Sequence, residues 1–293
     1  MKILNFGSLN IDIVYAVEHI VKPGETISAP TRALHAGGKG LNQSVAAARA
    51  GAQVIHAGNI GADGAFLAEL LRDAGADVSH LRTLDVPSGH AVIQVDKNGQ
   101  NSILVCGGAN RMYDWEYIDA MLSLAEPGDF VLTQNETNEV PYLLRSAHAK
   151  GLRVALNPSP MTEDIPAWPL ECVSLFLVNE TEGEAITGKN TQEDILAAME
   201  ERFPNAETIL TLGKKGAVRS LKGQRIFQKS YPVKAVDTTA AGDTFTGFYL
   251  AGLIRGETPE TALNKASMAS AIAVSRPGAA PSIPLRKEVE DAL

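Results

Sequence analysis

The segment 237–244, which reads DTTAAGDT, combines small residues, a helix start and a carboxylate. Its small residues allow a tight turn with accessible main-chain N–H groups. Apolar residues follow at helical spacing, so a helix begins here; they are Phe245, Phe248, Tyr249 and Leu253. Because the first N–H groups of a helix have no partner within it, the segment predicts an anion site made by Ala240, Ala241 and Gly242.

Asp243 places a negative charge in that first turn. One interpretation is a general base beside an anion site, which is what phosphoryl transfer to an alcohol requires. The other is an acid that only caps the helix and interacts with its dipole. This octapeptide by itself leaves both interpretations open.

Two loops near the N-terminus carry further polar groups. The segment 35–43, HAGGKGLNQ, contains glycines that allow close approach of the backbone to a ligand, with Lys39 and Asn42 as polar partners. It lacks the spacing of a Walker A loop, so alone it is a weak signal. Asn10 and Asp12 follow the first predicted strand, where short polar side chains commonly meet sugar hydroxyls; a simple Asx turn is the alternative.

Two later strand ends carry polar or glycine-bounded loops. Asn179 and Glu182 could hold magnesium-bound water near phosphates, but they equally match a helix capping box. The loop from Thr211 to Gly216 could cover a nucleotide or form an ordinary turn.

Composition excludes several classes of protein. The 293 residues include 26 Lys and Arg against 34 Asp and Glu, a formal net charge of -8, which argues against a nucleic-acid partner. No apolar run is long enough for a membrane span. No signal-peptide pattern precedes the first strand, and two cysteines do not make a disulfide framework, so we expect a cytoplasmic protein.

Strand and helix patterns alternate along most of the chain, which indicates a parallel sheet covered on both faces, with ligands beyond the carboxyl ends of its strands. The predicted strands are Ile3–Phe6, Val54–Ala57, Phe130–Thr133, Val154–Leu156, Leu175–Val178 and Thr208–Thr211. The predicted helices are Gly40–Ala50, Ala62–Ala74, Trp115–Leu124, Val140–Lys150, Thr181–Thr187, Thr191–Arg202, Thr244–Arg255 and Pro259–Ser275. Ile13–Ala36 and Ser88–Cys106 break the alternation and match antiparallel β-ribbons, as a lid or as surface hairpins.

Taken together, these motifs resemble the ribokinase-like (PfkB) carbohydrate kinases over essentially the whole chain. The two signatures of that family match Gly37–Gly51 and Asp237–Gly247 in order and separation. The resemblance implies a three-layer α/β fold with a mainly parallel central sheet and a small β-sheet lid. It places the kinase core at residues 1–12, 37–87 and 107–293, and the lid at 13–36 and 88–106.

The resemblance also implies roles for individual residues. Asp243 would be the catalytic base, with the anion hole for the γ-phosphate at 240–242. The sugar would contact Asn10, Asp12, Gly38, Lys39, Asn42 and Glu136. ATP would contact Asn179, Thr211, Gly213 and Gly216, and Glu182 would act on Mg²⁺ through water. A monovalent cation, K⁺, would be held by Asp237, Thr239, Ala273, Arg276, Gly278 and Ser282, several of them through main-chain carbonyls.

The function implied is ATP-dependent phosphorylation of the primary hydroxyl of a pentose, D-ribose first, by a homodimer paired through its lid. A nucleoside kinase or a kinase of another sugar would share Asp243 and differ in the sugar pocket. A sugar-sensing pseudokinase is the non-enzyme alternative, against which the intact DTTAAGD loop counts. Pro277 and Cys106 depart from the residues typical of the family.

Overall fold

Eight strands form the central sheet of the computed structural model, which describes residues 1–293. Their order is β14-β13-β12-β11-β10-β9-β1-β4. The six strands from β12 to β4 run parallel to one another. At the edge beyond β12, β13 pairs antiparallel with β12, and β14 pairs antiparallel with β13. The bounds are β1 Ile3–Phe6, β4 Val54–Ala57, β9 Phe130–Gln134, β10 Arg153–Asn157, β11 Leu175–Asn179, β12 Glu207–Thr211, β13 Gly216–Leu221 and β14 Gln224–Lys229.

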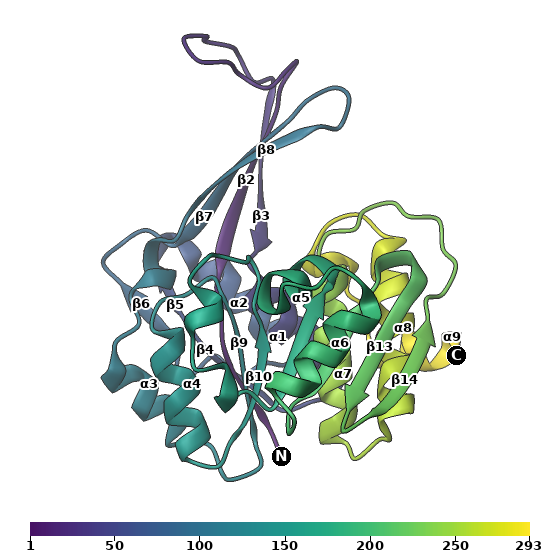
Figure 1. Cartoon of the computed structure of the whole chain (residues 1–293). Coiled ribbons are helices and arrows are strands. Elements are labelled where there is room, and N and C mark those ends of the chain that lie inside the picture. The colour runs from purple at the N-terminus through teal and green to yellow at the C-terminus, as the bar shows by residue number, and fades with distance from the viewer.

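Side chains alternate between two hydrophobic cores along the parallel strands, because successive residues of a strand point to opposite faces. Ile3 belongs to one core and Leu4 to the other, and both are fully buried. The first core packs under α1 (Lys39–Arg49), α2 (Ala65–Asp73), α7 (Ala241–Ile254), α8 (Pro259–Val274) and α9 (Arg286–Ala292). The second packs under α3 (Trp115–Leu122), α4 (Val140–Ala149), α5 (Glu180–Thr187) and α6 (Gln192–Arg202). The predicted three-layer α/β class is therefore confirmed (Figure 1).

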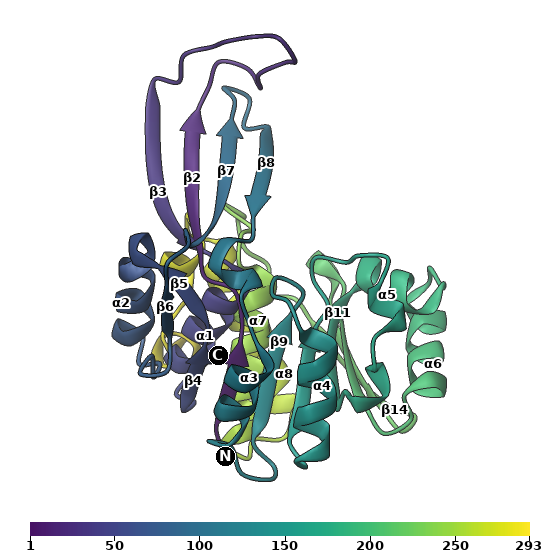
Figure 2. The same ribbon diagram turned by 90° about the vertical axis from the view of Figure 1, so that its left-hand side faces the viewer.

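A second, four-stranded sheet projects from one end of the molecule (Figure 2). We call it the lid sheet; its order is β3-β2-β7-β8, with β2 Asn10–Ala16, β3 Thr31–Gly37, β7 Gly89–Val95 and β8 Asn101–Cys106. Both expected antiparallel ribbons are present, and they join through the parallel pair β2–β7. Because β2 begins at Asn10, residues 10–12 belong to a strand of this sheet, although the expected boundary put them in the core.

The structure also contains elements that the sequence patterns did not predict. The hairpin β13–β14 turns at Lys222 and Gly223, both with positive φ, and a third small sheet pairs β5 (Asn59–Gly61) with β6 (Arg82–Leu84). The helix expected at Ala62–Ala74 starts with a 3₁₀ turn, Ala62–Gly64, before α2. No helix has the length and apolar character that a membrane crossing needs.

Helices α1 and α7 approach closely at one glycine. A Cβ added to Gly247 would lie 2.4 Å from the Ala46 Cβ and 2.5 Å from the Ala47 main-chain nitrogen. Such separations are far below van der Waals contact, so only glycine allows this crossing. Asn42 and Gln43 lie one helical turn before Ala46 and Ala47 on α1, and Asp243 lies one turn before Gly247 on α7. The crossing therefore also determines how these polar side chains meet.

We therefore expect Gly247→Ala to destabilise the protein, because overpacking against the α1 backbone outweighs the better helix propensity of alanine. Overpacking a tight core costs about 1–3 kcal/mol. The free energy of unfolding, measured in urea, checks this. Gly242→Ala is the matched control on the same helix, since its added Cβ meets no atom within 4 Å; equal stability of the two variants would contradict the prediction.

Candidate active site

The N-terminus of α7 begins with a backbone reversal at Ala240, which has φ of 60° and ψ of 9°. The turn is therefore made at an alanine in the left-handed region, and not at Gly242, whose φ is ordinary. The Thr244 N–H bonds to the Ala240 carbonyl at 2.8 Å and the Ala241 N–H to the Thr238 carbonyl at 3.3 Å. The Gly242 and Asp243 N–H groups stand in the first turn, where a helix offers no internal acceptor.

Asp243 lies between α7 and α1 and is only 7% exposed. Its Oδ2 accepts a hydrogen bond from Asn42 Nδ2 at 3.1 Å, and its Oδ1 accepts one from Gln43 Nε2 at 2.9 Å. A buried carboxylate needs such partners, since an unpaired one is costly. An acid that only caps a helix at the surface would not be buried and would not need two side-chain donors from another helix. The burial and the contacts of Asp243 therefore favour the base interpretation.

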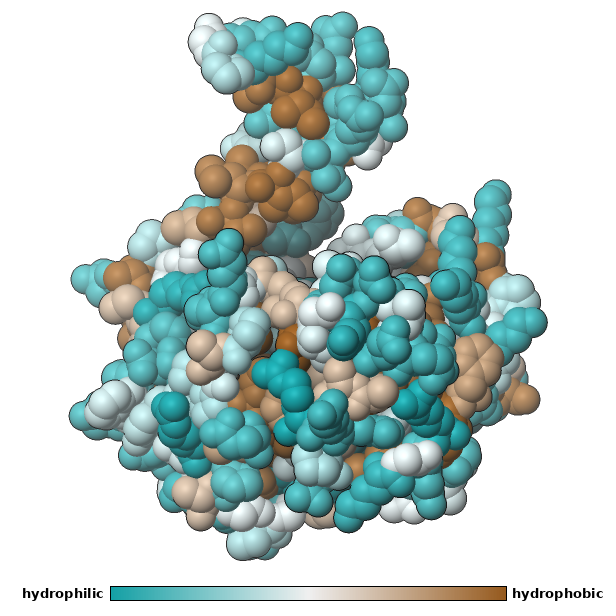
Figure 3. All heavy atoms as spheres, in the orientation of Figure 1, coloured by the Kyte–Doolittle hydropathy of each residue, from teal (hydrophilic) through white to brown (hydrophobic).

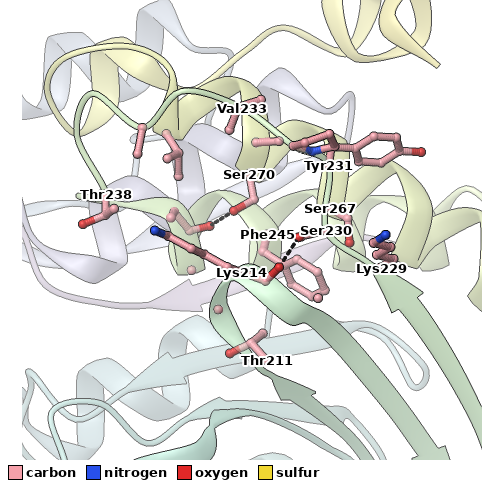
Figure 4. A pocket seen from close by; sticks show the side chains of 18 residues that line it. Thr211, Lys214, Lys229, Ser230, Tyr231, Val233, Thr238, Phe245, Ser267 and Ser270 are labelled. Carbon is pink, nitrogen blue, oxygen red and sulfur yellow. Dashed lines mark hydrogen bonds between the residues drawn. The ribbon is translucent and has the colours of Figure 1, made fainter.

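Two adjoining cavities meet at the start of α7. The smaller, about 260 Å³, is lined by Lys39, Asp243 and the residues of the predicted anion hole, and also by Asn179 and Glu182. The larger, about 650 Å³, extends from Gly242 past α8 (Figure 4). Thr211, Thr238, Ala241, Gly242 and Phe245 line both, so the structure joins the expected phosphate and nucleotide regions.

The larger cavity has the shape of a nucleotide-sized cleft with few charged groups. Gly213 and Gly216 line this cavity together with Lys214. Ser270 on α8 donates to the Ala241 carbonyl at 3.0 Å (Figure 4). Gly216 has φ of 125°, and a Cβ there would lie 2.0 Å from the Gln228 carbonyl oxygen. This position therefore requires glycine for backbone packing, whatever it binds.

The expected sugar residues gather where the lid sheet meets α1. The Glu136 carboxylate accepts hydrogen bonds from Ser8 Oγ and, at 2.9 Å, from the Lys39 N–H. Gly38, with φ of 96°, leaves no room for a side chain beside Ser8. Asn10, at the start of β2, accepts from Asn110 Nδ2 at 2.7 Å and makes no hydrogen bond to the other expected sugar residues.

Asp12 stands on β2 against the backbone of Gly37, where an added Cβ would lie 2.2 Å from its Oδ2. Burial raises the pKa of Asp12 to about 6, the nearby Glu136 carboxylate adds to the rise, and His35 opposes it. Asp12 and Glu136 thus place two carboxylates near each other, and ligand hydroxyls could donate to both.

Asn179 and Glu182 form the capping box that the spacing allowed. Asn179 Oδ1 accepts from the Glu182 N–H at 2.9 Å, and Glu182 Oε2 accepts from the Asn179 N–H at 3.0 Å. Burial raises the pKa of Glu182, and the Asn179 N–H opposes that rise. Both residues also line the smaller cavity, so capping and a role in the site are compatible.

Asp237 ties two loops together behind the anion hole. Its Oδ1 accepts from the Thr239 N–H at 2.9 Å and from the Thr239 hydroxyl at 2.6 Å, and its Oδ2 accepts from the Gly278 N–H at 3.0 Å. Burial opposes these bonds, but together they hold the pKa of Asp237 below its usual value. Ala273, near the end of α8, and Ser282 lie on either side of Gly278 in the chain, whereas the Arg276 side chain pairs with Glu288 at 2.6 Å.

The sequence patterns missed several polar residues of this region. Gln43 belongs to the glycine-rich segment but had no expected role, and Asn157 and Ser159 line the smaller cavity unexpectedly. Gln134 and Asn157 end the buried strands β9 and β10. Polar residues at the carboxyl ends of parallel strands are the signal that could have found them.

An anion site, a buried carboxylate and a nucleotide-sized cavity together fit an enzyme that moves a phosphoryl group to a hydroxyl. The chain matches the pfkB family carbohydrate kinases over residues 1–286. It is 36% identical over 294 residues to the ribokinase of Haemophilus influenzae, covering 96% of this chain and 95% of that one. The chain therefore belongs to the pfkB family of carbohydrate kinases.

Two solved structures extend the comparison. The ribokinase of Cryptococcus neoformans in complex with ADP matches with a TM-score of 0.90 and 33% identity, covering 100% of this chain and 99% of that one. The ribokinase of Arabidopsis thaliana complexed with ribose and ATP matches with a TM-score of 0.88 and 31% identity, covering 99% and 97%. The similarity thus includes the lid sheet as well as the central sheet.

The raised pKa of Asp12 predicts a pH-dependent stability difference. Its folded pKa of about 6 exceeds the ordinary 3.8, so the folded protein binds more protons between these values and loses stability as pH rises through them. Asp12→Asn removes this loss, and should be more stable than wild type by about 1–3 kcal/mol above pH 7.

Urea unfolding of both proteins from pH 4 to pH 8 checks this expectation. The advantage of Asp12→Asn should grow between pH 4 and pH 6 and level off above. Asp85→Asn, at an exposed loop position, is the control. A difference that does not change with pH would show that burial of the Asp12 charge has no such cost.

Proposed function

We propose that this chain transfers the γ-phosphoryl group of ATP to the primary hydroxyl of D-ribose or a close pentose. The observation that carries the proposal is the buried Asp243 carboxylate, held by two amide donors at the N-terminus of α7 and facing the smaller cavity. The full-length similarity to ribokinases, one of them solved with ribose and ATP, supports the choice of sugar. ATP as the phosphoryl donor is compatible with the expected cytoplasmic location.

In this mechanism Asp243 accepts the proton of the attacking sugar hydroxyl. At the same time the sugar oxygen forms a bond to the γ-phosphorus, and the bond from that phosphorus to the ADP oxygen breaks. Charge develops on the phosphoryl oxygens, where the N–H groups of Gly242 and its neighbours at the helix start stabilise it. Lys39, which lines the same cavity, adds a positive charge on the opposite side.

The sugar would lie between the lid sheet and α1. Asn42 supports this placement, because its Nδ2 is engaged by Asp243 while its buried Oδ1 has no partner in the protein. A buried acceptor without a donor costs about 1–3 kcal/mol, which a sugar hydroxyl would relieve. Asp12 and Glu136 offer carboxylate oxygens, and Asn10, Gly38 and Lys39 complete the proposed contacts.

ATP would occupy the larger cavity with its phosphates towards α7, near Asn179, Thr211, Gly213 and Gly216. Mg²⁺ is commonly bound by nucleotide phosphates and water with one or two carboxylates. Glu182, which lines the smaller cavity, would act on Mg²⁺ through water, and Mg²⁺ would neutralise phosphate charge.

A coupled ADP-release assay tests the function. With ATP and Mg²⁺, a panel of ribose, deoxyribose, fructose, ribitol, adenosine and fructose phosphate should show a preference for ribose.

Asp243→Asn should bind ATP normally but lower turnover by about two to four orders of magnitude, the usual contribution of a general base. Asp291→Asn, on the exposed end of α9, is the control. Sugar binding without ADP release in the wild type would instead indicate a pseudokinase.

A monovalent cation is the second component to test. Asp237 and the main-chain carbonyls around Ala273, Gly278 and Ser282 would provide the oxygen ligands for K⁺, with Thr239 and Arg276 in the same segments. The cation would supply positive charge behind the anion hole. We expect turnover to rise with K⁺ in the presence of Mg²⁺; equal rates in K⁺, Na⁺ and a bulky organic cation would exclude this role.

The lid sheet provides the proposed dimer interface. Its edge strand β8 exposes Ile103, Leu104 and Val105, at 54%, 71% and 63%, and the lid carries a large apolar area (Figure 3). A second copy would cover these side chains and the open strand edges in a two-fold arrangement.

Light scattering of the wild-type protein should give the mass of two chains, and the Leu104→Asp variant should give the mass of one. A wild-type mass of 31.1 kDa, that of a single chain, would contradict the dimer.

A further inference from the structure

Gln43 is fully buried in the second turn of α1 and connects Asp243 to the interior of the sheet. Its Nε2 donates to Asp243 Oδ1 at 2.9 Å and to Asn157 Oδ1 at 3.1 Å, while its Oε1 accepts from Gln134 Nε2 at 2.7 Å. Its two N–H hydrogens and its carbonyl oxygen are therefore all used. A side chain with every polar group engaged has one orientation.

The orientation of Gln43 is imposed from both ends by main-chain carbonyls, which can only accept hydrogen bonds. Asn5 Nδ2 donates to the Gly40 carbonyl at 2.8 Å, so Asn5 Oδ1 must face Gln134 and accept from its Nε2, at 3.1 Å. Asn157 Nδ2 donates to the Leu177 carbonyl at 3.0 Å, so its Oδ1 faces Gln43. We call Asn5, Gln134, Gln43 and Asn157 the amide relay.

Only one arrangement of the four amides satisfies both carbonyls, and it presents an N–H of Gln43 to Asp243. With the amide of Gln43 turned over, its carbonyl oxygen would face the Asp243 carboxylate, and its NH₂ would face the NH₂ of Gln134. Such a reversal places two acceptors and two donors against each other in a buried site, where unpaired polar groups are costly.

We propose that Gln43 is a positioning residue, which holds the Asp243 carboxylate in one orientation, and that the amide relay fixes the Gln43 donor towards Asp243. The inference rests on the proposed function, in that Asp243 is taken as the base. An N–H donor stabilises a carboxylate and fixes its rotation, so the other lone pairs of Asp243 can meet the substrate hydroxyl. Asn42 supplies the second donor, on Oδ2.

Steady-state kinetics of three variants tests the role. Gln43→Met keeps the length of the side chain but removes its donor, and should lower kcat about 10- to 100-fold while the KM for ATP changes less than about twofold.

Gln43→Glu keeps the shape and places a second carboxylate against Asp243, so the acidic limb of the pH profile of kcat should move up by about one unit or more. Gln134→Met, which touches no Asp243 atom, should lower kcat less than Gln43→Met, because Asn157 Oδ1 and Asp243 Oδ1 still hold the Gln43 N–H groups in place.

Ser44→Ala is the matched control for a merely structural effect. Ser44 is as buried as Gln43, and bonds to Asn5 and His56 but not to Asp243. Asn5 keeps its bond to the Gly40 carbonyl in this variant. We expect Ser44→Ala to lose stability while kcat and its pH profile stay unchanged. If Gln43→Met kept the wild-type kcat, or Gln43→Glu kept the wild-type pH profile, the positioning role would be wrong.

A double-mutant cycle on unfolding separates this inference from the proposed function. The urea midpoints of Gln43→Met, Asp243→Ala and the double variant report the contact without any catalysis. Non-additive midpoints support the coupling of Gln43 to Asp243 even if no sugar in the panel is phosphorylated, in which case only the proposed function fails. Additive midpoints would overturn the inference even in an active sugar kinase.

Discussion

The close crossing of α1 and α7 is the constraint on which the rest of the site depends. Gly247 lets the two helix backbones approach at Ala46 and Ala47. One helical turn is about 5.4 Å, so the residues one turn earlier on each helix also meet, and there Asn42 and Gln43 reach Asp243. The apolar packing in the middle of the helices and the polar contacts at their N-termini are thus consequences of one geometry.

The polar side chains beneath this crossing hydrogen-bond to one another. Asn5, Gln43 and Gln134 are at most 1% exposed, and the NH₂ group of each donates to two acceptors, while the Oε1 of Gln134 has no partner. Burying polar groups without partners is unfavourable, so these paired groups favour a single arrangement. Asp12 is the contrasting case, because its charge is buried beside Glu136 with little compensation and the pKa of Asp12 rises. A buried carboxylate with few hydrogen-bond donors from the protein is suited to accept hydrogen bonds from a ligand.

The lid sheet joins the kinase core next to the start of α1. Strand β2 leaves the core at Asn10 and carries Asp12, while β3 ends at Gly37, next to the start of α1. Residues that face the proposed sugar therefore belong to the same strands that form the lid. In the proposed function, this continuity would link any covering of the sugar to the residues that would bind it.

The sequence by itself determined the elements whose signals are local. Buried runs such as Ile3–Phe6 and Val54–Ala57 predicted strands with the observed bounds, since both faces of a parallel strand are apolar. The hairpin β13–β14 escaped prediction because its turn, Lys222-Gly223, is not an Asn-Gly type signal and β14 is largely polar. The DTTAAGD loop likewise predicted a helix start with an acid in its first turn.

Tertiary structure alone decided the partners of that acid. Gln43 and Asp243 are 200 positions apart, and Gln134 lies 91 positions from Gln43. No local pattern encodes such contacts, because they depend on where α1 crosses α7 and on where β9 and β10 end. The sequence placed a carboxylate at a helix N-terminus; the packing of distant segments decided which donors hold it and which cavities it faces.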